Sequence, residues 1–180
     1  MKLKVNFVSK TPKVAMANEI VFVKNKNIKN KNLNPILTKI FDNQLFKENL
    51  CVQKEYKNIN YIFVNCSKTS LSYDYENIGS KLFDYLKNNK IENSFFNVSK
   101  SNINNIHLEK VIHGAKRKSY NFDIYKADAK KNKIINLNIV GKKLVKANIL
   151  RKKLNALLEG VFFTRDLVSE PGNILHYKQI

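Results

Sequence analysis

The chain has 180 residues, of which 43% are hydrophobic and 11% aromatic. This composition excludes a disordered chain and suffices for the core of one domain, or one domain with a connecting arm. No apolar run reaches the roughly 18 residues of a membrane span. The start of the chain lacks the apolar run and cleavage site of a secretory signal, so we expect a cytoplasmic protein without membrane contact.

The formal net charge is +19, from 33 Lys and Arg against 14 Asp and Glu. The excess is almost entirely lysine, because arginine occurs only at Arg117, Arg151 and Arg165. Proteins that read bases or clamp phosphates favour the forked guanidinium group of arginine. We therefore expect weak, salt-sensitive and nonspecific attraction to polyanions, in preference to specific nucleic-acid binding.

The first half of the chain alternates predicted strands with predicted helices. Leu3, Val5 and Phe7 alternate with polar residues, which is typical of a half-buried strand. Asn34 followed by Pro35 is a favourable helix start, since Asn caps and Pro suits the first turn. In order, we predict a strand over residues 3–7, a strand over 19–23, a helix from 34, strands over 50–52 and 61–64, a helix over 71–88 and a strand over 94–98.

The second half continues with a helix capped by Ser101, which carries Ile103, Ile106, Val111 and Ala115 on its apolar positions. Strands are predicted over 120–125 and 134–140. A long amphipathic helix is predicted over 142–168. Its apolar stripe comprises Leu150, Leu154, Leu157, Leu158, Val161 and Phe162.

The alternation of strands and helices predicts an α/β domain layered around one central mixed sheet, followed by a long connecting helix. No internal repeat or linker divides the first 140 residues. We therefore place a domain over 1–141, and the connecting helix together with the last residues of the chain over 142–180.

The residue types that usually carry metal or thiol chemistry are few and scattered. Cys51 and Cys66 lack CxxC spacing, so two half-buried thiols in strands are expected. His107 and His113 are six residues apart, not the three or four that place two ligands on one helix face. We expect polar surface roles for both, and His176 has no identifiable partner.

Nor does the sequence contain a recognisable catalytic motif. The acidic pairs Asp74 with Glu76 and Asp123 with Asp128 lie among Lys and Tyr residues and are interpreted as solvated surface. The five glycines form no phosphate-binding loop, and no GxSxG segment occurs. We assign no catalytic residue, no cofactor-binding residue and no metal ligand.

The basic triplet over 116–118, followed by Tyr120, Phe122 and Tyr125, has two interpretations. It could form a basic and aromatic strip for single-stranded nucleic acid. Alternatively, aromatic residues at period two are what a half-buried strand requires, with the triplet in the preceding turn. We favour the second, in which Tyr120 and Phe122 point into a sheet.

Two segments of the chain resemble one enzyme family. The first runs from Gly114 to Lys126 and ends SYNFDIYK, which is similar to the "YxFDxYK" segment of leucyl aminopeptidases. The second is EGVFFTRDLVSEPGNIL over 159–175, which resembles the "EGVNLTRDLVNEPANVLTP" segment that joins the two domains of that family. Tyr177 departs from the pattern, since the family usually has proline there.

The resemblance implies a macro-like, three-layer amino-terminal domain of a hexameric, metal-dependent exopeptidase that removes amino-terminal residues from peptides. The family binds two divalent metals, zinc or manganese, in a carboxy-terminal domain that also holds a catalytic lysine and an arginine in an "NTDAEGR" segment. No position here matches those residues, so the chain alone is expected to be inactive.

Under this hypothesis the chain is a separated domain, a fragment or a split-gene product, whose partner is a catalytic-domain chain or further copies of itself. Two alternatives stay open, a basic module that binds nucleic acid or an ADP-ribose-type ligand, and a remnant without a retained role.

Two expectations concern the terminal helix. Glycine inside a helix costs about 1 kcal/mol relative to alanine, so Gly160 predicts a close packing contact. Without a catalytic domain, part of the stripe of Leu154, Leu158 and Phe162 is expected to lack cover and to promote self-association.

Overall fold

The computed structural model describes residues 2–9, 17–24, 35, 48–69, 71–101, 103–123, 125, 133–141 and 149–171. Its strands are β1 (Lys2–Val8), β2 (Ala17–Val23), β3 (Cys51–Tyr56), β4 (Ile59–Asn65), β5 (Asn93–Asn97) and β6 (Ile134–Val140). Its helices are α3 (Ser72–Asn88), α4 (Asn105–Lys118) and α5 (Ile149–Ser169), with a short 3₁₀ turn η2 (Val98–Lys100).

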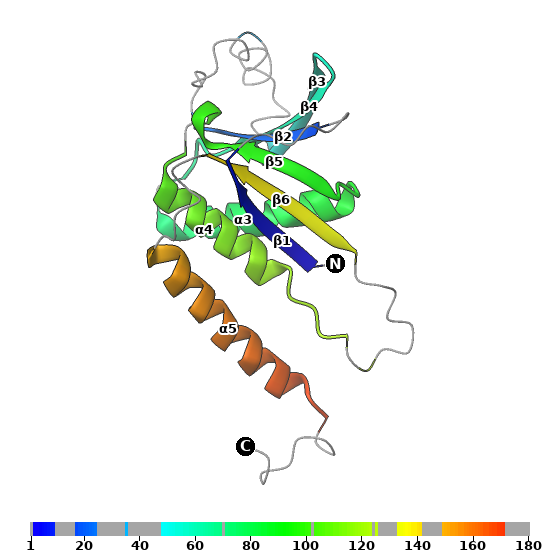
Figure 1. Cartoon of the computed structure of the whole chain (residues 1–180), viewed down its shortest axis with the longest axis vertical. Coiled ribbons are helices and arrows are strands. Elements are labelled where there is room, and N and C mark those ends of the chain that lie inside the picture. The colour runs from blue at the N-terminus through cyan, green and yellow to red at the C-terminus, as the bar shows by residue number, and fades with distance from the viewer. Residues whose placement is uncertain are drawn as a thin grey trace.

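The six strands form one mixed sheet in the order β1-β6-β5-β2-β4-β3 (Figure 1). All neighbouring pairs are parallel except β3 with β4, which are antiparallel at one edge. Figure 1 shows α3 and α4 side by side against one face of the sheet, with α5 beyond α4. The predicted α/β fold, with a mixed sheet and a long final helix, is confirmed.

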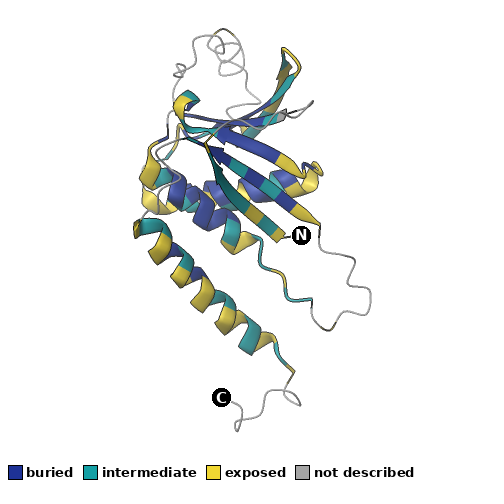
Figure 2. Cartoon of the chain, viewed as in Figure 1, coloured by how far each residue is buried: buried dark blue, intermediate teal, exposed yellow. Residues whose placement is uncertain are grey.

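The core follows from the apolar runs of the central strands. Ile20 and Val21 are adjacent in β2 and almost fully buried, because parallel central strands are covered on both faces. Ile20 packs with the residues beneath α3 and α4, whereas Val21 packs with Tyr61 and Phe63 on the opposite face. Burial is deepest in these central strands and weakens toward β1 (Figure 2).

The predicted N-terminal cap of α4 is wrong. Asn104, not Ser101, caps α4, since its side chain accepts a hydrogen bond of 2.8 Å from the backbone N–H of His107. Ser101 is fully buried, and its hydroxyl accepts a hydrogen bond of 3.2 Å from the backbone N–H of Phe22. That donor lies beyond the three-residue pairing of β2 with β5, which ends at Ile20 opposite Phe96. The Ser101 hydroxyl therefore pairs with a backbone N–H group of β2 and does not cap a helix.

Two glycines allow α3 and α4 to cross closely. A Cβ atom on Gly79 would lie 1.9 Å from the backbone oxygen of Val111, and one on Gly114 would lie 1.9 Å from that of Glu76. Ser80 ties the same crossing with a hydrogen bond of 3.1 Å to the carbonyl of Gly114. Only residues without a side chain fit at these two positions, a role that the sequence interpretation did not assign.

Some predicted elements fall outside the described residues. Of the helix expected from Asn34, the structure describes only Pro35, which is helical. The long helix was predicted from residue 142, and its described part begins at Ile149.

Candidate functional site at the terminal helix

The inner face of α5 packs against the domain. Leu154 and Leu158 are 8% and 4% exposed, so the expected lack of cover is wrong for these two residues, and Phe162 is half-buried. Leu157, predicted in the same stripe, is 56% exposed and faces away. Leu157 should not have been included in the buried stripe. At 3.6 residues per turn it lies about 100° around the helix from Leu158.

The first turn of α5 is held by a buried ion pair. The Nη2 and Nε atoms of Arg151 lie 2.7 and 3.0 Å from one carboxylate oxygen of Glu109 on α4. The Glu109 side chain is 1% exposed and that of Arg151 is 14% exposed. The guanidinium carbon of Arg151 also lies 3.4 Å from the ring centroid of Phe7 in β1. One side chain thus connects α5 to α4 and to the edge of the sheet.

The predicted strand over 120–125 is wrong. In the described part, residues 120–123 and 125, the backbone is not in a strand. Two of its side chains instead contact α5 or the residue that follows it. The Tyr120 hydroxyl donates a hydrogen bond of 2.7 Å to Asp166, and its ring lies 5.2 Å from that of Phe162. The guanidinium of Arg165 lies 3.9 Å from the Tyr120 ring, and the Tyr125 hydroxyl donates to Glu170.

These contacts bring together the two segments that carry the family resemblance. Tyr120 and Tyr125 belong to the first, and their partners Asp166 on α5 and Glu170 just after it belong to the second, about 45 residues later. Tyr120 therefore packs against a helix and does not point into a sheet, whereas Tyr125 is 49% exposed. We call the contacts of Tyr120 with α5 and of Tyr125 with Glu170 the junction.

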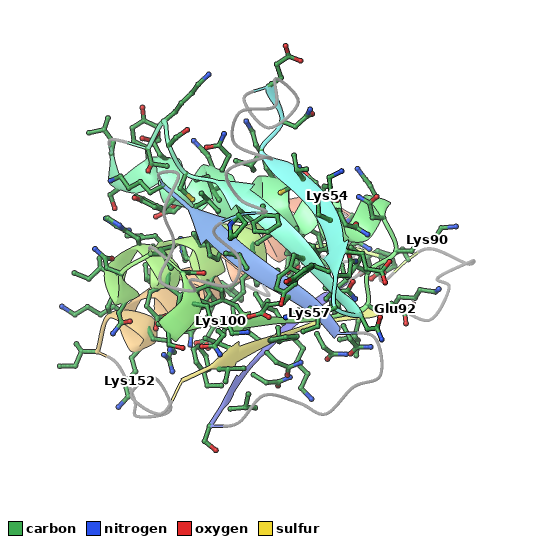
Figure 3. All side chains as sticks on the ribbon, turned by 90° about the horizontal axis from the view of Figure 1, so that it is seen from above. Lys54, Lys57, Lys90, Glu92, Lys100 and Lys152 are labelled. Carbon is green, nitrogen blue, oxygen red and sulfur yellow. The ribbon has the colours of Figure 1, made fainter. Side chains whose placement is uncertain are left out.

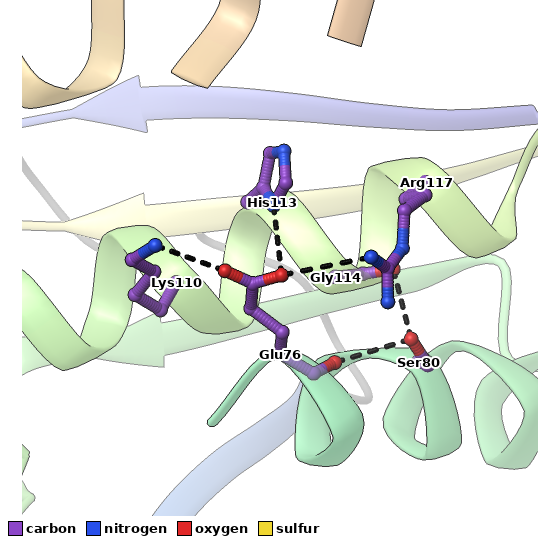
Figure 4. A network of polar contacts seen from close by, with 6 residues as sticks. All are labelled: Glu76, Ser80, Lys110, His113, Gly114 and Arg117. Atoms are coloured by element: carbon purple, nitrogen blue, oxygen red, sulfur yellow. Dashed lines mark hydrogen bonds and ion pairs between the residues drawn. The ribbon is translucent and has the colours of Figure 1, made fainter. Parts of the chain in front are cut away.

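A second polar cluster joins α3 to α4 on the side chain of Glu76 (Figure 4). Its carboxylate lies 3.0 Å from Nζ of Lys110, 3.3 Å from Nδ1 of His113 and 3.7 Å from Nη1 of Arg117. His113 is only 5% exposed, so the expected surface role is wrong for this residue, and Glu76 is not a solvated carboxylate. Burial raises the pKa of Glu76, but Lys110 and His113 together outweigh it through their hydrogen bonds and charges and lower this pKa overall.

The buried imidazole predicts a pH dependence of stability. Burial, with smaller contributions from Arg117 and Lys110, lowers the pKa of His113, although Glu76 opposes the shift. The unfolded chain then takes up a proton near pH 6.5 that the folded chain does not, so stability falls as pH drops through about 6.5. The slope for one histidine is at most about 1.4 kcal/mol per pH unit.

Urea unfolding between pH 7.5 and 5.5 tests this expectation. His113→Gln should flatten the slope, and His107→Gln measures the separate contribution of His107, whose pKa is also lowered by burial. Equal slopes for the unaltered chain and His113→Gln would contradict the assignment.

The buried carboxylates of the described residues are paired with cations. Glu19, with a fully buried side chain in β2, lies 2.9 Å from Nζ of Lys100. Burial raises the pKa of Glu19, against the opposing effect of Lys100. Such pairing supports structural roles for Glu19, Glu76 and Glu109.

The cysteines and the potential metal ligands among the described residues do not form a site. Cys51 is half-buried, Cys66 is buried, and burial raises both pKa values to about 12. Among the described residues, no three His, Cys, Asp or Glu side chains gather as they would around a metal ion. No described helix is both long enough and apolar enough to cross a bilayer.

The positive charge is spread over many elements. Lys54 lies in β3, Lys57 in the turn between β3 and β4, Lys90 between α3 and β5, and Lys152 on α5 (Figure 3). Lys100 instead pairs with the buried Glu19. The expected weak and nonspecific attraction to polyanions stays a prediction.

Comparisons with known proteins concern parts of larger chains. No protein-family model matches the chain. Over 67 residues, which are 34% of this chain and 14% of the relative, it is 40% identical to the probable cytosol aminopeptidase of Phytoplasma mali (strain AT). The fold is similar to that of a mutant of tomato leucine aminopeptidase, with a TM-score of 0.63 at 16% identity over 97% of this chain and 39% of that one.

A further similar structure is the bottromycin maturation enzyme BotP in complex with Mn, with a TM-score of 0.54 at 10% identity. That similarity covers 87% of this chain and 32% of that one. The chain therefore spans well under half the length of each of these relatives.

Proposed function

Because the chain is related to the leucyl aminopeptidases, over the part that the comparisons cover, we propose that it is a noncatalytic amino-terminal domain of such an enzyme. In this proposal residues 1–141 form the domain, which is macro-like in fold, and residues 142–180 lead to the metal-bearing catalytic part. The enzyme would act in the cytoplasm on the amino-terminal residues of peptides.

The observation that carries the proposal is the junction. The two segments whose residues resemble the family lie far apart in the sequence, yet Tyr120 contacts both Phe162 and Asp166. This contact between the two segments explains why the first has an aromatic residue at Tyr120 and the second has Phe162 and Asp166 facing it. It also fixes the direction in which α5 leaves the domain, which is what a bridge between two domains requires.

The role assigned to the domain is to support assembly and substrate access. The catalytic and metal-binding segments of the family have no counterpart in this sequence, so the chemistry must come from another part of the enzyme. The partner is a catalytic-domain chain, and assembly into oligomers would occur through the complete enzyme.

An assay with leucine p-nitroanilide and Mn²⁺ tests the proposal. The purified chain is expected to give no hydrolysis above the blank, with the intact Phytoplasma mali enzyme as the positive control. A chimaera in which this chain replaces the amino-terminal part of that enzyme is expected to hydrolyse the substrate with Mn²⁺. Turnover by the chain alone, or an inactive chimaera, would contradict the proposal.

A further inference from the structure

A pocket lies where β4 ends and α3 begins. Its volume is about 310 Å³, within the range of about 300–1,000 Å³ that is common for small-molecule sites. Its walls come from the residues just before β3, from the end of β4 with the turn after it, and from one face of α3. A hydrogen bond of 2.7 Å from the backbone N–H of Asn65, the last residue of β4, to the carbonyl of Leu50 joins two of these walls. Parallel strands commonly hold ligands at this end, outside their carboxyl termini.

One face of α3 forms the longest wall. The lining residues Asp74, Asn77, Ile78 and Lys81 follow the helical spacing i, i+3, i+4 and i+7, so they share one side of the helix. Asp74 lies in the first turn, and Lys81 follows it by two turns, or about 10 Å along the helix axis. Ile78 lies between them and is 5% exposed. This face therefore presents a carboxylate, an apolar surface and an ammonium group in that order.

The carboxylate at the start of the helix is held in place. Oδ2 of Asp74 accepts a hydrogen bond of 2.8 Å from the backbone N–H of Leu71, as part of the cap of α3. Glu48 supplies a second carboxylate from the wall before β3. Each carboxylate can accept further hydrogen bonds, because its two oxygens offer about four acceptor sites. An ammonium group can therefore bind there in addition to the contacts that these side chains already make.

The two cations of the pocket are unpaired. Lys68 and Lys81 both line it, and within the part of the chain that the structure describes neither has a hydrogen bond or an ion pair. Lys100 and Lys110, by contrast, lie 2.9 and 3.0 Å from buried or half-buried carboxylates. Lys68 follows β4 whereas Lys81 lies on α3, so the two amines reach the same space from separate walls. One carboxylate of a ligand could accept charge-assisted hydrogen bonds from both.

The balance of charge in the pocket selects the class of ligand. Two lysines and two carboxylates line it, so their formal charges cancel, although the whole chain carries +19. A phosphate would be repelled by both carboxylates, and a metal ion by both lysines. A zwitterion can pair with both signs. The side chains of Leu50 and Ile78, which pack together with the core, offer an apolar surface for an aliphatic group between its two charges.

We propose that this pocket binds a small zwitterion with an aliphatic side chain, which is a free amino acid such as leucine or a dipeptide. The ammonium group of the ligand binds Asp74, its carboxylate binds Lys68 and Lys81, and its side chain lies on Ile78. The site is complete within the described residues. The proposed function supplies a source of the ligand, because removal of amino-terminal residues from peptides releases free amino acids, but the binding does not depend on it.

Titration calorimetry of the full chain with leucine and its analogues tests the site. Leucine is expected to bind saturably. Leucinamide lacks the carboxylate and N-acetylleucine lacks the ammonium group, so each should bind about tenfold more weakly or worse, since each loses hydrogen bonds between charged groups. Glycine should also bind more weakly, because it lacks the apolar side chain. Leucyl-leucine carries the same termini farther apart, and the tighter of leucine and leucyl-leucine identifies the length of the ligand.

Variants of exposed lysines separate the pocket from the general positive charge. Lys68→Gln and Lys81→Gln should each weaken leucine binding about tenfold. Lys87→Gln removes the same charge from an exposed position farther along α3, outside the pocket, and should leave binding unchanged. Thermal unfolding of the three variants checks that each is folded, as expected for replacements at exposed positions.

Three results would overturn the proposal. The first is the absence of saturable leucine binding to the unaltered chain. The second is an equal effect of Lys81→Gln and Lys87→Gln, which would mean that only the net charge matters. The third is displacement of leucine by inorganic phosphate at equal concentration, which would make the pocket a general anion site. None of these results bears on the hydrolysis assay with the chimaera, so the proposed function stands or falls separately.

Discussion

Gly114→Ala is expected to destabilise the chain by about 3 kcal/mol or more, or to prevent folding. The added Cβ atom would lie 1.9 Å from the backbone oxygen of Glu76, and a backbone atom cannot turn aside as a side chain can. Gly79→Ala should have a similar effect, since its Cβ atom would lie 1.9 Å from the oxygen of Val111. Either substitution forces α3 and α4 apart above the apolar core that they cover.

Gly160→Ala in the isolated chain is the matched control. It makes the same chemical change in a helix interior, but the new methyl group meets no atom of the described residues within 4 Å. Alanine is the better helix former, so this variant should gain about 1 kcal/mol. Urea unfolding of the three variants measures the difference. A Gly114→Ala chain as stable as the unaltered one would show that the helices do not cross as described.

Arg151→Ala is expected to cost about 3–5 kcal/mol, because it leaves the carboxylate of Glu109 buried without its main cation. The Glu109 side chain is 1% exposed, and both hydrogen bonds from Arg151 reach the same oxygen. Loss of the contact with the Phe7 ring adds to the cost, since that ring lies under the guanidinium.

The double variant Glu109→Met with Arg151→Met separates the ion pair from its packing. Replacing both charges with apolar side chains of comparable length should restore most of the lost stability, because no buried charge then remains unpaired. Arg151→Lys should lie between, since an ammonium group cannot reproduce two N–H donors in a fixed plane. Unfolding free energies decide the matter. An Arg151→Ala variant within about 1 kcal/mol of the unaltered chain would exclude this role.

Much of the sheet could be predicted because its signals are local. The β-branched run of β2 and the alternation in β1 each identify a strand from a few neighbouring residues. The helices α3 and α5 are likewise visible from their periodicity. Such patterns reveal an element and its apolar side, but they do not reveal which other element will cover it.

The features that the sequence interpretation missed are contacts between distant segments. The period-two spacing of Tyr120 and Phe122 fits both a strand and an extended segment beside a helix. The contact that distinguishes the two is the hydrogen bond from Tyr120 to Asp166, which lies 46 residues later in the sequence. Ser and Asn are both favourable helix caps, so the sequence alone does not choose between Ser101 and Asn104. The choice depends on the buried N–H of Phe22, which donates its hydrogen bond to Ser101 and leaves Asn104 to cap α4. His113 looked solvated because Glu76 lies on another helix.

The pairing of β1 with β6 has a consequence for the order of folding. Lys2 is aligned with Ile134 and Val8 with Val140, so β1 pairs with a strand that lies about 130 residues later in the sequence. Contacts of such long sequence separation slow folding, because the intervening chain must first be brought together. We therefore expect the edge strand β1 to join the sheet late, after the pairs that are closer in sequence have formed.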